Sequence, residues 1–228
     1  MSIRPTPLAL NEYYHIYSRG VDKRPIFLEQ GDKERFIRLL YICNSSTPIV
    51  YREVRNLPLS LVKTGEKITA IGAYCLMPNH FHLLLRETEE GGITKFMRKF
   101  LTAYSSYFNL KYERNGILFS SRFKSSHLDS DEYLKHIFSY IHLNPIKIFK
   151  SDWDNRSLDR LVAENTLKKY KESSYFDYAS DNDRPESLIL NKLAFPEYFL
   201  TKEKFRDNIF DWFDDSRYSI ELTKDGPM

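Results

Sequence analysis

Two histidines one residue apart form the pattern in this chain that points most directly to chemistry. His80 and His82 flank Phe81 at the start of a run that continues with three leucines. Because successive side chains of a strand point to opposite faces, His80 and His82 share one face and Phe81 lies on the other. Two adjacent imidazoles can hold one divalent metal ion. Hydrogen-bonded histidines of a core or a surface have the same spacing, so the pair alone leaves both interpretations open.

Residues 130–145 are predicted to form a helix whose faces differ in character. Ser130 is a favourable N-cap that precedes two acidic residues, and Pro145 ends the helix. Apolar residues spaced three and four apart predict a core-facing stripe: Leu134, Ile137, Phe138 and Ile141. A second stripe, with members four apart, carries His136, Tyr140 and Asn144. The alternative is that Tyr140 is a core residue and Asn144 a C-terminal cap.

Together these motifs resemble the single-tyrosine transposases of the HUH nuclease superfamily, named for histidine, hydrophobic residue, histidine. The resemblance is strongest to the insertion-sequence-200-like transposases, and among them to the REP-associated tyrosine transposases. Further matching segments are residues 14–20, 119–125 and 170–175, and the motifs occur in the family's order across residues 11–180. The resemblance implies a HUH nuclease domain over residues 1–150.

The resemblance also implies roles for individual residues. Tyr140 would be the nucleophile, His80 and His82 two metal ligands, and Asn144 the polar residue one turn later that completes the metal site. An amide oxygen is a weaker ligand than a carboxylate, so we expect loosely bound Mg²⁺ or Mn²⁺. His136 matches no family role and, like His142, is expected to pack, to cap or to lie near DNA.

The implied activity is metal-dependent cleavage and rejoining of single-stranded DNA through a 5′-phosphotyrosine, at hairpin-forming repeats. A phosphodiester repels a nucleophile by its own charge, and a metal on a non-bridging oxygen neutralises that charge. A phenol, with a pKa near about 10, is also a better leaving group than an aliphatic hydroxyl, which suits a reversible step. The sequence identifies no general base.

Other interpretations compete with this one. The chain could be a hairpin DNA-binding protein that retains the HUH fold without cleavage, or a HUH nuclease of replication or plasmid transfer. It could also be a structural zinc protein that unfolds when its metal is removed. The sequence leaves a homodimer open, because insertion-sequence relatives work as dimers, whereas REP-associated relatives can use a tyrosine and histidines of one chain.

Composition and charge fit a globular DNA-binding protein. Among 228 residues, 42% are hydrophobic, which suffices for a substantial core. Residues 1–150 carry 22 Lys and Arg against 14 Asp and Glu, a net charge of +8, whereas residues 151–228 carry 12 against 17, a net charge of −5. The basic part is expected to contact phosphates. Two cysteines and no signal-like or membrane-spanning segment predict a cytoplasmic protein without membrane contact.

The predicted fold class is α+β: a ferredoxin-like antiparallel sheet with helices packed on it and an acidic, mainly helical extension over residues 151–228. Strands are expected at residues 13–19, 68–76, 80–86 and 117–127, and helices at residues 32–43, 92–111 and 130–145. Residues 47–67 are expected to be irregular or a β-excursion, and residues 181–185 a linker. Shorter helices are expected at residues 165–170, 188–193 and 202–213.

Six basic residues are candidate DNA contacts. Arg19 ends the first predicted strand, and Arg122 and Lys124 are two apart on another. The rest lie on the helix at residues 92–111, away from its apolar stripe: Lys95, Arg98 and Lys99. A solvated helix face and edge-strand protection are the alternatives.

Overall fold

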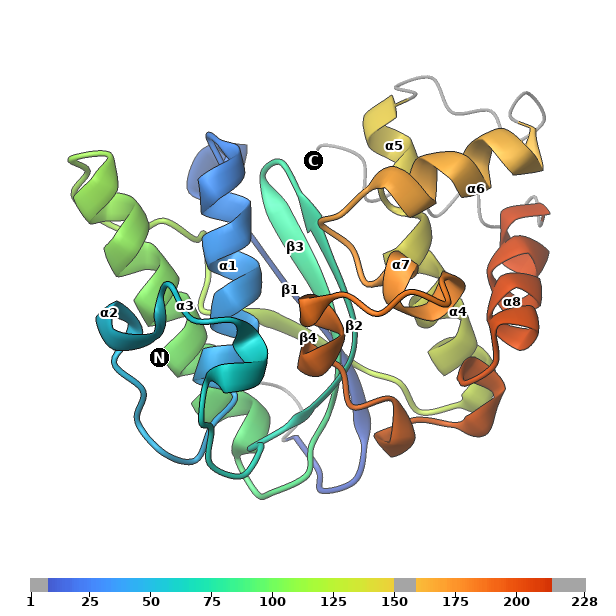
Figure 1. Ribbon diagram of the computed structural model, residues 1–228, viewed down its shortest axis with the longest axis horizontal. Helices are drawn as coiled ribbons and strands as arrows, with labels where there is room; N and C mark the ends of the chain where they lie inside the picture. The colour runs from blue at the N-terminus through green and yellow to red at the C-terminus, as the bar shows by residue number, and fades with distance from the viewer. Residues whose placement is uncertain (1–7, 150–158, 215–228) are drawn as a thin grey trace.

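The computed structural model describes residues 8–149 and 159–214, and within them the predicted α+β fold is confirmed (Figure 1). One antiparallel sheet has the strand order β2-β3-β1-β4. Its strands are β1 (Tyr13–Arg19), β2 (Ala70–Met77), β3 (His80–Arg86) and β4 (Lys124–His127). Helix α1 (Gln30–Cys43) connects β1 to β2, and α3 (Gly92–Lys111) connects β3 to β4. This connectivity is ferredoxin-like.

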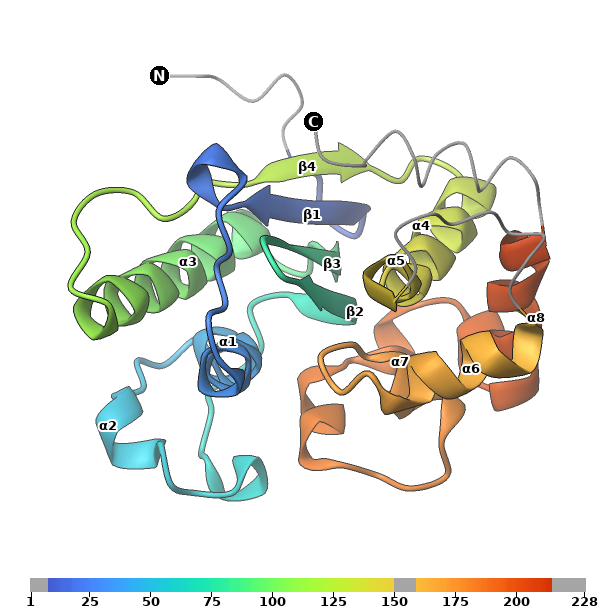
Figure 2. The same cartoon turned by 90° about the horizontal axis from the view of Figure 1, so that it is seen from above.

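Because side chains alternate between the two faces of the sheet, the strands contribute to two separate hydrophobic cores. Ile16 of β1 and Phe81 of β3 pack toward α1 and α3 in one core. Cys75 of β2 and Leu84 of β3 belong to the other core, which includes α4 (Asp131–Leu143). Figure 2 shows α1 and α3 on one side of the sheet and α4 with the C-terminal helices on the other. Because His80 and His82 alternate with Phe81, they lie on the α4 side.

The C-terminal extension is helical, as predicted. It contains α6 (Arg160–Lys169), α7 (Tyr175–Ala179) and α8 (Lys202–Asp214), and α5 (Ile146–Phe149) precedes it. Its chain covers the edge of the sheet, because Leu76 N donates to Glu172 O at 2.9 Å and Ser174 N donates to Tyr74 O at 3.0 Å. Helix α8 packs on α4. The predicted boundary between residues 150 and 151 lies outside the described residues.

Several predicted segments differ from the structure. Instead of one helix at residues 188–193, the chain forms two 3₁₀ helices, η4 (Pro185–Ile189) and η5 (Lys192–Ala194). The strand expected at residues 117–127 pairs regularly with β1 only over its last four residues. Upstream of them, Ser120 N donates to Arg19 O, and the chain bends between Ser120 and the start of β4. Residues 47–67 are irregular, as one alternative predicted, apart from the short helices α2 (Tyr51–Val54) and η2 (Leu59–Leu61). They contain no strand, so the alternative of a β-excursion is wrong. Residues 181–185 are not a simple linker, because Arg184 forms an ion pair with Asp177 at 2.7 Å.

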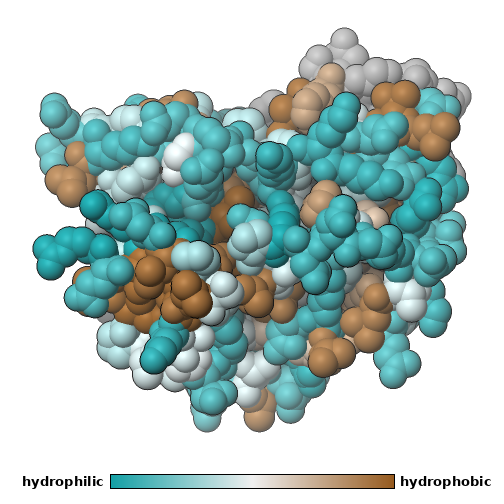
Figure 3. Space-filling model, in the orientation of Figure 1, coloured by the Kyte–Doolittle hydropathy of each residue, from teal (hydrophilic) through white to brown (hydrophobic). Residues whose placement is uncertain are grey.

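The face of the molecule seen in Figure 3 is mostly hydrophilic. It has an apolar patch over α2 and the residues that follow it. Val50, Leu57 and Leu61 are the large apolar side chains exposed in this segment. Among residues 8–149 and 159–214, no helix combines the length and the apolar character needed to cross a bilayer.

Candidate active site

The histidine pair and the tyrosine singled out by the sequence line one cavity of about 660 Å³. The cavity lies on the α4 side of the sheet, where side chains of β1, β3 and β4 converge. Those that line it are His15, Tyr17 and Arg19 of β1, His80 and His82 of β3, Lys124 and Ser126 of β4, and Tyr133, His136 and Tyr140 of α4. Strand alternation explains these strand residues, because on each strand they form an i, i+2 series. Ser18 of β1, which is not part of that series, also lines the cavity.

Helix α4 brings the tyrosine to the histidines. Its N-cap is Ser130, whose side chain accepts a hydrogen bond from Tyr133 N at 3.2 Å, and its C-cap is Asn144. The ring of Tyr140 meets the ring of His82 edge-on, with 5.3 Å between centroids and 89° between planes. Tyr140 is only 3% exposed. The phenol ring therefore lies against His82 at the inner wall of the cavity.

His82 is buried as a neutral imidazole with one nitrogen engaged. Burial, followed by the nearby charges of His80 and His15, holds the pKa of His82 well below its usual range. Its Nδ1 lies 2.8 Å from Nε2 of His15. Within the part of the chain that the structure describes, Nε2 of His82 has no hydrogen-bond partner. A neutral ring with one unused nitrogen meets the requirement for a metal ligand.

The neighbouring asparagine fixes the tautomer of His80. Asn79 Nδ2 donates to Lys23 O at 3.0 Å, which leaves Asn79 Oδ1 to face Nδ1 of His80 at 2.6 Å. The amide oxygen only accepts, so Nδ1 of His80 carries the proton in the neutral ring and Nε2 carries the lone pair. In this tautomer the lone pair of His80 that could bind a metal is on Nε2.

Asn144 supplies a third buried acceptor. Its Nδ2 donates to Tyr140 O at 3.0 Å, whereas its Oδ1 has no hydrogen-bond partner among the described residues. The residue is fully buried and does not itself line the cavity. The described part of the chain contains no group of three His, Cys, Asp or Glu suited to a metal. Imidazole nitrogens and an amide oxygen are donor types that hold a divalent ion weakly. Nε2 of His82 and Oδ1 of Asn144 are both buried without a hydrogen-bond partner among the described residues.

The predicted DNA-contact residues divide between the two faces of the sheet. Arg19 and Lys124 line the cavity, and Arg122 is exposed on the loop that leads into β4. The three basic residues of α3 lie on the opposite side, where Lys95 pairs with Glu89 at 3.2 Å and Lys99 donates to Ser45 O at 2.6 Å. The third, Arg98, is exposed on the same helix. The structure therefore brings Arg19 and Lys124 to the histidines and does not bring the α3 residues there.

The other two histidines of the motif helix differ from each other. His142 is fully buried and bonds Phe138 O through Nδ1 at 2.9 Å and Ser174 Oγ through Nε2 at 2.8 Å. Burial lowers its pKa to about 3, so it is a neutral packing residue. His136 lines the cavity, with its ring 4.6 Å from that of Trp212 in α8.

Sequence reasoning assigned no role to three residues that the fold brings to the site. His15 and Tyr17 lie on β1 beside Arg19, and their rings are 5.0 Å apart. Lys147 of α5 places its Nζ 4.9 Å from the centroid of the Tyr140 ring. The alternation of β1 could have placed His15, Tyr17 and Arg19 on one face. Nothing in the sequence could have paired that face with His82, because the strand register is not a local property.

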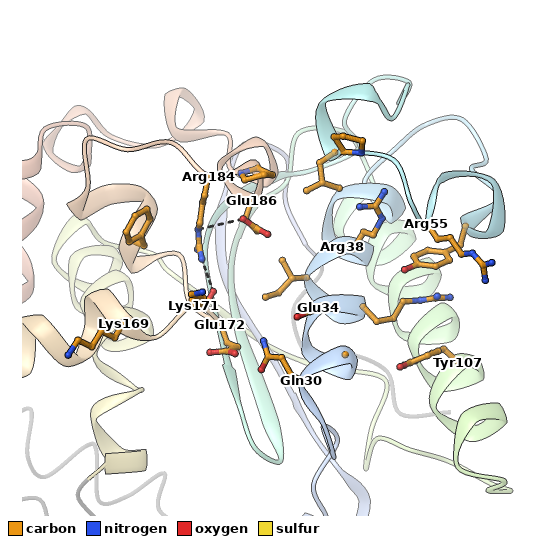
Figure 4. A pocket seen from close by; sticks show the side chains of 18 of the residues that line it. Gln30, Glu34, Arg38, Arg55, Tyr107, Lys169, Lys171, Glu172, Arg184 and Glu186 are labelled. Atoms are coloured by element: carbon orange, nitrogen blue, oxygen red, sulfur yellow. Dashed lines mark hydrogen bonds and ion pairs between the residues drawn. The ribbon is translucent and has the colours of Figure 1, made fainter.

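A second and larger cavity, of about 960 Å³, carries different chemistry (Figure 4). It lies between α1, residues 51–59 and residues 168–186. Three of its arginines make structural contacts: Arg38 donates to Val54 O and Leu57 O, Arg35 stacks 3.1 Å from the Tyr51 centroid, and Arg184 is paired as described above. It is lined by no histidine and by none of the predicted site residues. The smaller cavity is therefore the candidate active site.

The comparison with protein families agrees with the motifs. A family model described as "Transposase IS200 like" matches residues 11–144, which include β1, the histidine pair, Tyr140 and Asn144. The chain belongs to this family of transposases, which act in DNA transposition. No curated protein matches the chain. A solved structure described as "Structure of the REP associates tyrosine transposase bound to a REP hairpin" is similar, with 14% identity, a TM-score of 0.47, and 82% of this chain and 90% of that chain covered.

Proposed function

We propose that this transposase cleaves and rejoins single-stranded DNA through a covalent 5′-phosphotyrosine at Tyr140. The observation that carries the proposal is the edge-on contact between Tyr140 and His82, 5.3 Å apart, in a cavity that also contains His80. A nucleophile and a pair of metal-binding histidines in one cavity constitute the minimum equipment for this reaction.

In the proposed step, the phenol oxygen of Tyr140 attacks the phosphorus and the bond from phosphorus to the 3′ oxygen breaks. The phenol proton leaves to a base, and the departing 3′ oxygen takes up a proton to become a hydroxyl. Attack by a 3′-hydroxyl on the phosphotyrosine reverses the step and restores the phenol, so no ATP is consumed. Lys147, whose Nζ lies beside the Tyr140 ring, can stabilise negative charge that develops on the phenol oxygen.

His80 and His82, with Asn144, would hold Mg²⁺ or Mn²⁺. When bound, the ion would neutralise and orient the scissile phosphate. The neutral state of His82 and the unused Oδ1 of Asn144 support this assignment. All of these residues belong to one chain, so we propose that the site is complete within a single subunit and that dimerisation is not required to assemble it.

For the substrate, we propose a DNA hairpin with a flanking single strand, as the motif resemblance implies. Arg19 and Lys124 would contact phosphates near the cleavage point, and Arg122 would extend this contact along the loop before β4. Lys95, Arg98 and Lys99 would contact phosphates only on a part of the DNA that reaches the opposite face of the sheet.

The test is a denaturing gel after incubation with labelled hairpin DNA and Mn²⁺. The wild type should shift the 3′-labelled strand into a protein-linked band and release a shorter 5′-labelled strand. Tyr140→Phe should abolish both products. Tyr133→Phe is the matched control, because Tyr133 is a phenol of the same helix and the same cavity; it should retain both. Chelation of the metal should remove the band, and a band that persists in Tyr140→Phe would refute the assignment.

The 3% exposure of Tyr140 favours a second candidate, a protein that binds hairpin DNA without cleaving it. A phenol this buried must become accessible before it can attack a phosphate. The same gel separates the candidates when a native gel accompanies it. Hairpin binding that is equal in wild type and Tyr140→Phe, with no covalent product in either, would establish the non-cleaving protein.

A further inference from the structure

We propose that His15 is a positioning residue that keeps His82 in the one tautomer a metal ligand can use. The inference rests on the proposed function in that His82 is taken as a metal ligand through Nε2. His15 belongs to β1 and His82 to β3, and the pairing register places Tyr17, not His15, directly opposite His82. The two histidine rings therefore meet diagonally across the two strands.

The contact between the rings is a hydrogen bond that must share one proton. Nε2 of His15 and Nδ1 of His82 are 2.8 Å apart, and the ring planes are within 20° of each other. Because an imidazole lone pair lies in the plane of its ring, this geometry suits an N–H of one ring pointing at the lone pair of the other. Both residues are buried, with 6% of His15 and 4% of His82 exposed, so water does not replace the bond.

Two arrangements of the proton are conceivable, and only one of them leaves a metal-binding lone pair on Nε2 of His82. If His15 donated, the neutral His82 ring would carry its own proton on Nε2, where no acceptor lies among the described residues. That proton would have to leave before Nε2 could bind a cation. If His82 donates from Nδ1 to His15, its Nε2 carries a lone pair instead. That second arrangement is also the only one in which Nε2 can coordinate a cation.

His15 thus does for His82 what Asn79 does for His80. Metal-binding histidines usually donate their second nitrogen to a carboxylate, a backbone carbonyl or water, and the partner fixes the tautomer and the ring orientation. Here the partners are an amide oxygen for one ring and a second imidazole for the other. His15 is itself held by Tyr17, whose ring lies 5.0 Å away at 28°. The same Nε2 that binds His82 is unavailable for the metal, so His15 acts through His82.

Nitrogen NMR of the metal-free wild type tests the tautomer without any variant. Long-range ¹H–¹⁵N correlations of the imidazoles should show His82 protonated at Nδ1, with the signal assigned by its loss in His82→Gln. A His82 ring protonated at Nε2 would overturn the proposal. This measurement also separates the proposal from the proposed function, because it reads the role of His15 even if the wild type bound no metal and the metal assignment failed.

Manganese affinity, measured by electron paramagnetic resonance of free Mn²⁺, provides the second readout. His15→Phe keeps an aromatic ring but removes the acceptor, and it should weaken Mn²⁺ binding by about 10- to 100-fold. His15→Gln restores an acceptor oxygen and should recover most of the affinity. His127→Phe is the control, because His127 lies on the opposite face of the sheet and bonds Glu12 at 2.8 Å. A folded His15→Phe protein with wild-type Mn²⁺ affinity would overturn the proposal.

Discussion

Tyr140 and His82 meet edge-on within one chain, although one belongs to helix α4 and the other to strand β3. The contact arises because α4 packs against the face of the sheet to which the alternation of β3 assigns both histidines. No second subunit is needed to bring a phenol to the histidine pair. This relationship determines how inactive variants should behave when they are mixed.

A mixture of two inactive variants should stay inactive. Tyr140→Phe lacks the nucleophile and His82→Ala lacks a ligand, and a site assembled within one chain cannot be rebuilt from the two. We expect no covalent DNA product from the mixture on the denaturing gel. Product above the level of either variant alone would show that the tyrosine of one subunit acts with the histidines of another.

Lys147 should affect the rate of cleavage more than the binding of DNA. Its Nζ lies 4.9 Å from the centroid of the Tyr140 ring, where a positive charge stabilises charge on the phenol oxygen. Lys147→Met should slow formation of the covalent product by about 10²-fold, with hairpin affinity little changed. Lys135→Met is the control, since Lys135 lies on α4 and pairs with Asp131 at 2.8 Å. A loss of affinity without a loss of rate would assign Lys147 to DNA binding.

Lys124 should contribute to DNA affinity in a salt-dependent way. Lys124 lines the active-site cavity. A contact with one phosphate of a single strand changes the slope of the logarithm of the DNA association constant against the logarithm of salt concentration by about 0.7. Lys124→Met should reduce the slope by about this amount, and fluorescence anisotropy with a labelled hairpin measures it. The comparison is a double variant that carries both Lys169→Met and Lys171→Met, because these two lysines line the larger cavity. An unchanged slope for Lys124→Met, or an equal loss in the comparison, would remove Lys124 from the DNA contacts.

Asp32 should make the stability of the fold depend on pH in the acid range. Burial acts to raise the pKa of this carboxyl, but hydrogen bonds from Lys111, Tyr112, the Leu28 backbone and Tyr107 outweigh it and lower the pKa from 3.8 to about 2. A lowered pKa in the folded state means that the ionised carboxylate stabilises the fold. The contribution, about 2 kcal/mol, is complete above pH 4 and is lost as the pH falls from about 4 to about 2.

Asp32→Asn should therefore lower the free energy of unfolding by about 2 kcal/mol at pH 7, and the difference from wild type should shrink below pH 4. Denaturant titrations at several pH values measure this. Asp22→Asn is the control, because the Asp22 carboxylate is 70% exposed and its ion pair with Arg24 is a surface contact. A difference that is constant down to pH 2 would contradict the role assigned to the charge.

Gly72 should be required for the packing of the C-terminal extension on the sheet. A Cβ at this position would lie 2.6 Å from the ring of Phe195, at the irregularity of β2 between Ile71 and Ala73. Gly72→Ala should destabilise the protein by about 1–3 kcal/mol, because neither the ring nor the strand can move freely in a filled core. Gly31→Ala, where the nearest atom is the flexible end of Glu29, should be close to neutral in the same thermal unfolding assay. Equal stability of the two variants would show that the contact with Phe195 is not tight.

Several features of this protein could be predicted from its sequence, because they depend on residues near one another in the chain. Strand alternation placed His80 and His82 on one face, and the four-residue spacing placed Tyr140 and Asn144 on one side of a helix. The order of strand and helix signals predicted the antiparallel sheet. The motifs together identified the family before any contact was known.

Tertiary structure alone decided which elements share the site. The register between β1 and β3 brings His15 to His82, and the packing of α3 on the far face separates its three basic residues from the cavity. Likewise, only the fold shows residues 172–174 covering the edge of β2. These facts depend on strand order, register and the choice of sheet face, which are set by contacts between residues distant in sequence and leave no local periodicity to detect.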